Sequence, residues 1–474
     1  MGQLITAVEH ADRAEPLRAY VTGLISIEGR KSVEPMAAVI DPMKVSKRHQ
    51  SMLHIVGTSP WSDGAVMKVA YDWAKGPITD HGPIDAMIFD DTGIPKKGRH
   101  SVGVGRQYCG VKGKQDNCQV VVSLSIGNET ATLPVAYRLY LPKDWAEDPD
   151  RRQKCGVPEK IEFQEKWKIA LMLVDDALAS GKPRVPVLAD AGYGDATDFR
   201  DGLTGRHLPY IVGVKKDTTV WEPGKGPLPP EPRTGKRGQP QKCLRRDEDH
   251  QPLPIVDIAR GLDPSDFTEV VWREGTKCEM QSRFAAVRVC PAHRDYYRTA
   301  PRPEEWLLIE WPSAEKEPTK YWLSTLNETT PLAELVRTAK MRWRIERDYQ
   351  ELKDELGIDH YEGRGWRGLH HHWALCIAAY AFLVAERALF SPLGPPGSDR
   401  GFRLPALPAT FQPRGAAARP ASPADVDNHA ADCSGHGADS QAGRVPDLPP
   451  LARGASRANR SVEDSGDPRA LMTQ

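Results

Sequence analysis

The clearest hydrophobic pattern lies late in the chain, in residues 341–356, MRWRIERDYQELKDEL. This stretch contains no Gly or Pro and is rich in strong helix formers. Met341, Ile345, Leu352 and Leu356 recur at helical spacing and form one apolar stripe. The pattern therefore predicts an amphipathic helix, which we extend upstream to about Leu332.

A second stripe on the same predicted helix is polar. Its members, at i, i+4, i+7 and i+11, are Arg342, Glu346, Tyr349 and Lys353. A carboxylate between two cations on one face suits a site that holds both a metal and phosphates. The alternative is a solvated face on which Arg342 and Glu346 form an ordinary surface pair of little energetic weight.

The first 78 residues have helical patterning throughout. We predict one helix over 46–56, a break at Gly57-Thr58-Ser59-Pro60 and a second helix through 65–73, with Ser59 as a cap before Pro60. Two helices joined by a short turn, with basic residues nearby, are compatible with a helix-turn-helix DNA reader. They are equally compatible with a plain helical hairpin.

Strand patterns follow this helical segment. The predicted strands cover 84–89, 118–126, 131–140, 185–189 and 210–214, with helices predicted at 163–180 and 197–203. Sequential antiparallel strands followed by alternating helices and strands indicate an α/β fold with a mixed sheet and helices on its faces.

The remaining patterns complete the predicted domain organisation. We predict a helical N-terminal domain (1–78), the first part of the α/β domain (79–215), a β-rich insertion (216–325), the second part of the α/β domain (326–390) and a tail (391–474). The insertion has aromatic-rich strand patterns at 267–273, 283–290, 306–311 and 321–325. The tail is dominated by Pro, Ala, Gly, Ser and Arg, so we expect it to be disordered.

Composition narrows the class of protein only partly. The 474 residues include 64 Lys and Arg and 64 Asp and Glu, so net charge does not indicate a nucleic-acid partner. The eight cysteines include no C-x-x-C pair, which fits free thiols in a reducing compartment. The apolar run at 373–385 is too short to span a bilayer. We therefore expect a cytoplasmic protein without a membrane partner.

Charge is concentrated locally. The segment 92–115 has six basic residues and no acidic one, and six glycines punctuate it. It fits a hairpin region that faces phosphates, although a solvated basic loop has the same composition. Residues 225–246 have seven basic residues and one acidic residue among prolines and glycines.

Acidic residues follow two of the predicted strands. Asp90-Asp91 ends the first strand, and Asp190 follows the strand 185–189. Together with Glu346 they supply carboxylate oxygens, the ligands that Mg²⁺ prefers. A pair of such ions can activate a water or a 3′-hydroxyl and stabilise the leaving oxygen in phosphodiester chemistry.

With these residues in hand, the chain resembles the DDE transposases of bacterial insertion sequences. RWRIE, with Lys353 seven residues after Glu346, resembles the Tyr-Arg-Glu-Lys signature of one large branch. Ala339 stands where that signature has Tyr, which leaves that DNA contact open. FDDTGIPKKGRHSVGV and VLADAGYGD resemble the blocks that carry the first two catalytic Asp residues. The resemblance covers residues 84–390 and does not include the tail.

The resemblance implies a ribonuclease-H-like fold and a set of roles. Asp91, Asp190 and Glu346 would be the catalytic metal ligands for two Mg²⁺ ions, with Mn²⁺ as an alternative, and the resemblance favours Asp91 over its neighbour Asp90. Double-stranded DNA, as inverted-repeat ends and as target, would be the partner, and a homodimer would hold the ends in synapsis at the nucleoid. The expected DNA contacts are Arg342, Lys353, Lys96, Lys97, Arg99, Arg364 and Arg367.

Several alternatives stay open at this point. A ribonuclease-H-like nuclease without strand transfer, and a DNA-binding relic that no longer cuts, would carry the same motifs. Trp366 could stack on an unpaired base or be a buried structural residue. His370, His371 and His372 are consecutive on a predicted helix and point in three directions, so we do not expect them to converge on one metal ion.

Overall fold

The protein is represented by a computed structural model that describes residues 1–231, 241–274 and 279–390. The predicted tail and part of the 225–246 segment therefore lie outside the described residues. The α-helices are α1 (Gly2–Ala7), α2 (Ala14–Ser26), α3 (Val33–Ile40), α4 (Val45–Gly57), α5 (Asp63–Thr79), α6 (Lys143–Ala146), α7 (Pro149–Cys155), α8 (Lys166–Ala179), α9 (Ala191–Gly194), α10 (Thr197–Gly205), α11 (Ile255–Gly261), α12 (Leu332–Lys340), α13 (Trp343–Asp354) and α14 (Trp366–Leu389).

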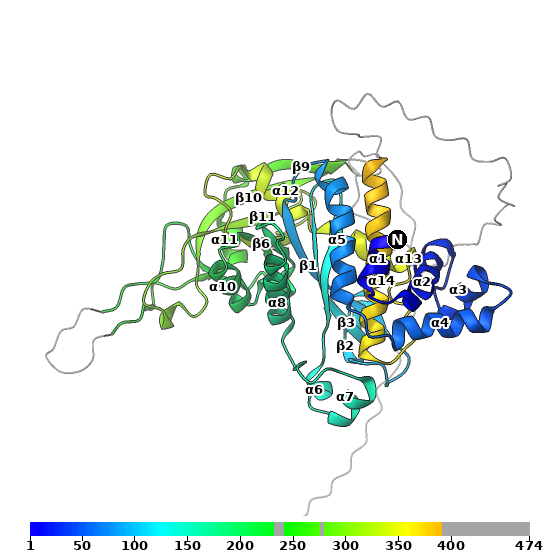
Figure 1. Ribbon diagram of the computed structural model, residues 1–474. Coiled ribbons are helices and arrows are strands. Elements are labelled where there is room, and N and C mark those ends of the chain that lie inside the picture. Colours follow the sequence, from blue (N-terminus) through cyan, green and yellow to red (C-terminus); the bar gives the residue numbers. More distant parts are fainter. Residues whose placement is uncertain (232–240, 275–278, 391–474) are drawn as a thin grey trace, which may run out of the picture. The chain divides into compact units, whose positions relative to one another are not determined.

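The strands form one mixed sheet (Figure 1). They are β1 (Ala86–Pro95), β2 (Gly105–Cys109), β3 (Lys114–Gly127), β4 (Thr132–Leu139), β5 (Val187–Ala189), β6 (Tyr210–Val214), β7 (Thr219–Trp221), β8 (Leu253–Pro254), β9 (Thr268–Glu274), β10 (Glu279–Pro291), β11 (Glu305–Glu310) and β12 (Lys320–Ser324). The first part runs β4-β3-β1-β5-β6, in which β5 and β6 are parallel to β1 and β3 is antiparallel. This arrangement confirms the predicted ribonuclease-H-like mixed sheet.

The β-rich insertion extends this sheet. β12 pairs with β6 in antiparallel register, Tyr321 opposite Val214, and β11, β10, β7 and β8 follow outward. Clustering by spatial contacts places all described residues in one compact unit. The boundaries predicted at 78, 215 and 325 therefore stay predictions about sequence organisation.

Helices from distant parts of the chain cover opposite faces of the central strands. On one face, Ile88 and Leu188 pack in a cluster with Val336 of α12 and Ile345 of α13. On the other face, Phe89 of β1 contacts Phe199 of α10, and α8 packs against β3. The alternation of side chains along β1 therefore decides which helices each residue meets.

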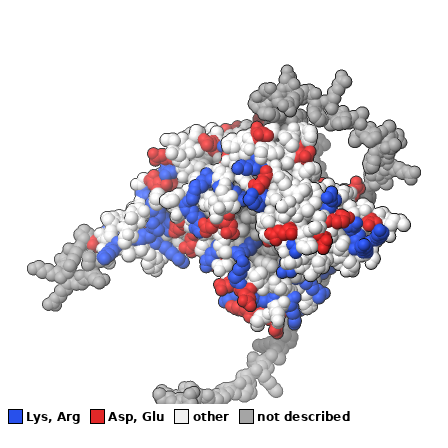
Figure 2. Space-filling view, viewed as in Figure 1, with Lys and Arg blue, Asp and Glu red and all other residues white. Residues whose placement is uncertain are grey.

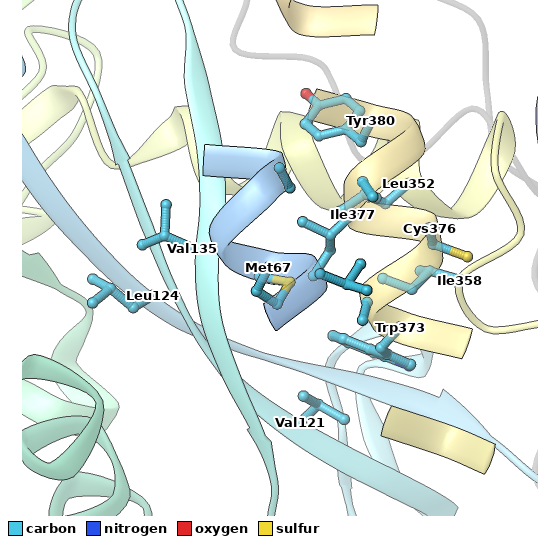
Figure 3. Close-up of a cluster of buried hydrophobic side chains, with 14 of the residues drawn as sticks. Met67, Val121, Leu124, Val135, Leu352, Ile358, Trp373, Cys376, Ile377 and Tyr380 are labelled. Atoms are coloured by element: carbon cyan, nitrogen blue, oxygen red, sulfur yellow. The ribbon is translucent and has the colours of Figure 1, made fainter. Parts of the chain in front are cut away.

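The long helix α14 forms the centre of the largest core (Figure 3). Trp373 and Ile377 of α14 lie among Met67 of α5, Val121 of β3 and Leu352 of α13 in this cluster. By length and composition α14 could cross a membrane, but 72% of its most apolar window is buried inside the protein. We therefore interpret α14 as a core helix of this fold.

The N-terminal helices share this core. Helices α4 and α5 confirm the two helices predicted there, although Ser62, not Ser59, caps α5 by accepting a hydrogen bond from Ala65 N at 3.2 Å. Helix α5 packs along α14 and against β4 (Figure 1). α4 packs mainly against α2, α3 and α14, so α4 and α5 meet in the core shared with α14 and do not pair along each other as a hairpin.

Two predictions about elements were wrong, and three helices were missed. β1 does not end at Asp91 but continues to Pro95, because the long strand β3 keeps pairing with it as far as Cys118. The single helix predicted over 332–356 is two helices, α12 and α13. Between them, Arg344 N and Ile345 N bond to carbonyls three residues back, Met341 O and Arg342 O, which tightens the turn. The helices α6, α7 and α11 were not predicted.

Candidate active site

The two neighbouring aspartates of β1 point to opposite faces of the sheet. Asp90 lies on the same face as Ile88, toward α13, where Arg342 Nη1 donates to its Oδ2 at 3.0 Å. Asp91 lies on the face toward α8, where Lys166 Nζ donates to its Oδ2 at 2.9 Å. Only one of the pair can therefore share a site with Glu346.

The register of the parallel strands brings Asp190 beside Asp90. Ile88 of β1 pairs with Leu188 of β5, so continuing two residues along each strand places Asp90 alongside Asp190 on the same face. Asp190 itself is the N-cap of α9, and its Oδ1 accepts from Gly192 N at 2.9 Å.

Close packing beneath α9 holds this turn in place. A Cβ on Gly194 would lie 2.0 Å from the carbonyl oxygen of Gly213 in β6. Only glycine allows the two backbones to approach this closely. The small-residue turn after Asp190 therefore sets the height of its carboxylate above the sheet.

Glu346 completes the group through Arg342. Arg342 Nη2 donates to Glu346 Oε1 at 2.5 Å, while Nη1 binds Asp90. Arg342, Glu346 and Asp190 line the same pocket, of about 370 Å³, together with Trp322 and Trp343. The turn between α12 and α13 positions Arg342 at the rim of this pocket, because Arg342 is the last residue before α13 begins.

The electrostatics of the group are those of crowded carboxylates. Burial raises the pKa of Asp90 to about 7; Arg342 opposes this rise, and the nearby charges of Asp190 and Asp91 add to it. The Asp90 side chain is only 17% exposed. Burial also works against the charge of Arg342, but Asp90, Glu346 and Asp190 together raise its pKa above the usual value. The Arg342 guanidinium therefore interacts favourably with three carboxylates: it pairs with Asp90 and Glu346 and is stabilised by the nearby charge of Asp190.

These residues fit a divalent cation by their chemistry. All three acidic groups offer oxygen ligands. Burial is the main cause of the raised pKa of Asp90, the charges of Asp190 and Asp91 add to it, and a cation beside the carboxylate would favour its ionised form. Among the described residues, no three His, Cys, Asp or Glu side chains converge closely enough to hold a metal in this conformation. Arg342 forms ion pairs with both Asp90 and Glu346 and so bridges the two carboxylates.

The polar stripe of α13 forms hydrogen bonds with β1. Tyr349 OH donates to the backbone carbonyl of Asp90 at 3.2 Å and lies 2.7 Å from Ser123 Oγ of β3. Lys353 Nζ donates to Thr92 Oγ1 at 2.7 Å, and burial lowers the pKa of Lys353. Arg342, Tyr349 and Lys353 of the predicted stripe therefore dock on β1, whereas Glu346 is exposed and pairs with Arg342.

The other cations expected to contact DNA occupy varied positions. Lys97, Arg99 and Arg364 are exposed, and within the described chain their side chains have no hydrogen bond or ion pair. Lys96 turns inward, and its Nζ donates to Tyr361 O at 2.6 Å. Arg367 is exposed but donates to Thr58 O at 2.8 Å.

Trp366 and the three consecutive histidines are structural. Trp366 is 9% exposed and stacks on His370, with ring centroids 4.3 Å apart. His371 stacks on Trp61 at 3.6 Å, and His372 lies 2.9 Å from Tyr20 OH. The three histidine rings therefore contact different parts of the fold, since His370 is hydrogen-bonded to Trp366 O, His371 to Val56 O and His372 to Tyr20 OH.

Sequence reasoning favoured Asp91 and left Asp90 as the alternative. The signal that separates them is the spacing from the apolar residues: Ile88 and Leu188 each precede an acidic residue by two positions. That signal depends on knowing which face the late helix covers. The contacts of Lys166 with Asp91 and of Tyr349 with β1 were not predicted either.

Comparison with known families gives this geometry its context. The model of the family described as DDE superfamily endonuclease matches residues 3–279, more than half of the chain. The chain belongs to this family. The match includes Asp90, Asp91 and Asp190 and ends before Glu346, so the third carboxylate is assigned here by its position in the fold. The expectation of a DDE-type enzyme, whose family depends on divalent metal ions, is confirmed at this level.

One curated relative adds detail. The chain is 27% identical over 207 residues to the probable transposase for insertion sequence element IS701 of Microchaete diplosiphon. The aligned region covers 44% of this chain and 50% of that protein. The chain therefore spans about half the length of the relative that it matches.

Proposed function

We propose that this DDE family member is the transposase of an insertion sequence, which cuts DNA at the ends of its element and joins them to a target. The observation that carries the proposal is the group of Asp90, Asp190 and Glu346 around Arg342 at the centre of the sheet. The family match and the similarity to a probable transposase support it.

In this proposal Asp90, and not Asp91, is the first catalytic carboxylate. Asp90, Asp190 and Glu346 hold two Mg²⁺ ions, with Mn²⁺ as a substitute. When bound, the ions activate the attacking oxygen and stabilise the leaving oxygen of the phosphodiester. Asp91 is held by Lys166 on the opposite face and contributes no ligand.

Arg342 has two roles in the same site. Without metal, it neutralises Asp90 and Glu346 and so keeps the carboxylates together. Its planar guanidinium would also suit a DNA phosphate, which it could bind through two parallel hydrogen bonds. Lys353 holds the edge of the site through Thr92 and supplies a point charge toward the backbone of the DNA.

The partner is double-stranded DNA, first the inverted-repeat ends and then the target. Lys97, Arg99, Arg364 and Arg367 extend the basic surface beyond the pocket, and two copies of the chain hold the two ends in synapsis. The protein acts in the cytoplasm, on nucleoid DNA. Lys96 contributes by fixing the loop at Tyr361 and not by direct contact.

The test uses a duplex that carries the terminal repeat found next to the gene, a target plasmid and Mg²⁺. The unaltered protein is expected to release the element end and to form a joined product. Asp90→Asn, Asp190→Asn and Glu346→Gln are each expected to lower cleavage by at least about a thousandfold, because every one removes a ligand to the cation.

Asp91→Asn is the matched control, because it removes the same charge from the neighbouring residue. It is expected to retain cleavage within about tenfold of the unaltered protein. Loss of cleavage in Asp91→Asn with retention in Asp90→Asn would refute the assignment. Cleavage without joined product would indicate a nuclease, and equal behaviour of all variants would indicate a DNA-binding relic.

A further inference from the structure

A second concave surface lies away from the candidate active site, between the β2–β3 hairpin and α7. It encloses about 720 Å³. Its charged lining residues are Lys97, Arg99, Arg106, Lys114, Asp116, Asp144 and Arg151. We call this surface the hairpin groove. It joins segments that are separate in sequence, since the loop after β1, both hairpin strands and α7 contribute to it.

Most of the positive charge in the hairpin groove has no partner. Asp116 is bound by Lys112 at 2.5 Å, and Asp144 lies 3.5 Å from Arg151. Lys97, Arg99, Arg106 and Lys114 are all exposed and, within the described residues, their side chains make no hydrogen bond or close ion pair. Lys114 is near enough to Asp116 to lower the pKa of that carboxyl, but cations still outnumber carboxylates in the groove, which favours a bound anion.

The backbone beneath these cations is fixed by side-chain hydrogen bonds. Asn117 Nδ2 donates to Lys96 O at 2.5 Å and to Gly98 O at 2.9 Å, which holds the loop that carries Lys97 and Arg99. Trp145 Nε1 donates to Val104 O at 2.6 Å and ties α6 to the start of β2. The groove is thus a built surface and not a loose basic loop.

Charges around α6 and α7 are separated on the surface. In Figure 2, acidic side chains gather on the left of the lower protrusion that α6 and α7 form, and basic side chains lie to its right. Elsewhere on the face shown, the two signs are interspersed, as expected for equal numbers of acidic and basic residues. The groove is therefore a local basic patch, which the zero net charge of the whole chain does not reveal.

The distance from the catalytic group follows from strand geometry. Ser123 of β3 pairs with Asp90, and Asn117, six residues along β3, lines the groove. Six to nine residues of strand span roughly 20–30 Å at about 3.3 Å per residue. A duplex that runs along β3 would cover that length with about six to nine base pairs, at 3.4 Å per base pair.

We infer that the hairpin groove binds the phosphate backbone of duplex DNA, about six to nine base pairs from the bond that is cut. The inference rests on the proposed function, because that function places the cut bond at Asp90. The groove holds the duplex through charge, without contributing to the chemical step. It also assigns DNA contacts to Arg106 and Lys114, on the hairpin.

The first experiment measures binding in the absence of metal, so that no cutting is needed. The probe is a fluorescent 30-base-pair duplex of random sequence, titrated with full-length protein at several salt concentrations. The test variant combines Lys97→Gln, Arg99→Gln, Arg106→Gln and Lys114→Gln. Since each lost phosphate contact removes about 0.9 from the slope of log K against log salt, the slope is expected to fall by about 3 to 4.

The matched control removes four exposed lysines outside the groove: Lys75→Gln, Lys160→Gln, Lys216→Gln and Lys316→Gln. It changes net charge equally and is expected to keep the slope within about one unit. A charge-preserving variant, Arg99→Lys with Arg106→Lys, is expected to behave like the unaltered protein. Equal slopes for the test and control variants would overturn the inference.

The second experiment tests the position of the groove. Donor-end duplexes are compared that extend about 4 or about 14 base pairs on the element side of the cut bond. The unaltered protein is expected to bind the longer duplex at least about a hundredfold more tightly, and the test variant to lose most of this preference. Unchanged preference in the variant would refute the assigned distance, whereas failure of the unaltered protein to cut either duplex would count against the proposed function alone.

Discussion

Asp348 offers a sharp test of how α13 is held against the sheet. Its side chain is 2% exposed and accepts three hydrogen bonds from hydroxyl groups. Thr132 Oγ1 and Tyr380 OH donate to Oδ1 at 2.6 and 2.9 Å, and Ser125 Oγ donates to Oδ2 at 3.2 Å. The residue lies two positions after Glu346 and links α13 to β3, β4 and α14.

The size of the expected change in folding stability follows from the pKa of the Asp348 carboxyl. Burial raises the pKa of Asp348 to about 6, although the three hydroxyl hydrogen bonds oppose the rise. The unfolded chain has a pKa near 3.9, so the difference is about two units, or about 3 kcal/mol. Because the folded protein binds the proton more tightly, folding stability falls as the pH rises from about 4 to about 6 and stays reduced above that.

The test substitution is Asp348→Asn, because the asparagine side chain has nearly the same shape as the aspartate side chain and cannot ionise. The carboxamide oxygen can accept from Thr132 and Tyr380, and its NH₂ can donate to Ser125 Oγ. Relative to the unaltered protein, the variant is expected to gain about 3 kcal/mol in free energy of unfolding between pH 4 and pH 8. Urea titrations at both pH values, followed by tryptophan fluorescence, measure this difference.

Glu334→Gln is the control, since Glu334 is an exposed carboxylate in the first turn of α12. It reports the effect of removing one negative charge near the same helices without burial. A difference between Asp348→Asn and the unaltered protein that does not change with pH would refute the reasoning, because the cost would then not arise from ionisation of a buried group.

Three further outcomes test other parts of the structure. Burial lowers the pKa of His372 to about 4. The free energy of unfolding is therefore expected to fall by up to about 3 kcal/mol as the pH drops from 6.5 to 4. In His372→Gln, unfolding measured over the same pH range should not show this decrease. Gly194→Ala places a Cβ 2.0 Å from a carbonyl oxygen of β6, so unfolding should show a cost of about 1–3 kcal/mol and metal-dependent cleavage should fall while metal-free DNA binding is kept. Ile345→Ala empties a fully buried position on α13 and should cost about 2–5 kcal/mol in urea unfolding, whereas the exposed Gln350→Ala on the same helix should change stability by less than about 0.5 kcal/mol.

Arg342 links two carboxylates of different exposure. Its guanidinium pairs with the largely buried Asp90 and with the exposed Glu346. The pKa of Asp90 is raised, since burial and neighbouring acids disfavour its charge. The backbone positions of the three acidic residues are fixed by β1, the turn after β5 and α13, whereas their carboxylates do not converge on one point in this conformation.

The sequence by itself determined the local elements and the set of chemical groups. Helical spacing predicted the apolar face of α13 and its polar stripe, and strand patterns located β5 and β6 closely, because burial on one or two faces imposes a period on the residues. The acidic residues were visible because each adjoins an apolar run. The confirmed fold class follows from the order of these elements.

The tertiary structure decided which of these groups meet. Asp90 and Asp91 are equivalent in sequence, and only the packing of α13 on one face and α8 on the other separates them. The extension of the sheet by the insertion, the turn between α12 and α13 and the hairpin groove likewise depend on pairing between distant segments. Local periodicity records that a side chain is buried or exposed, but not which distant partner covers it, because that choice is made by the whole chain as it packs.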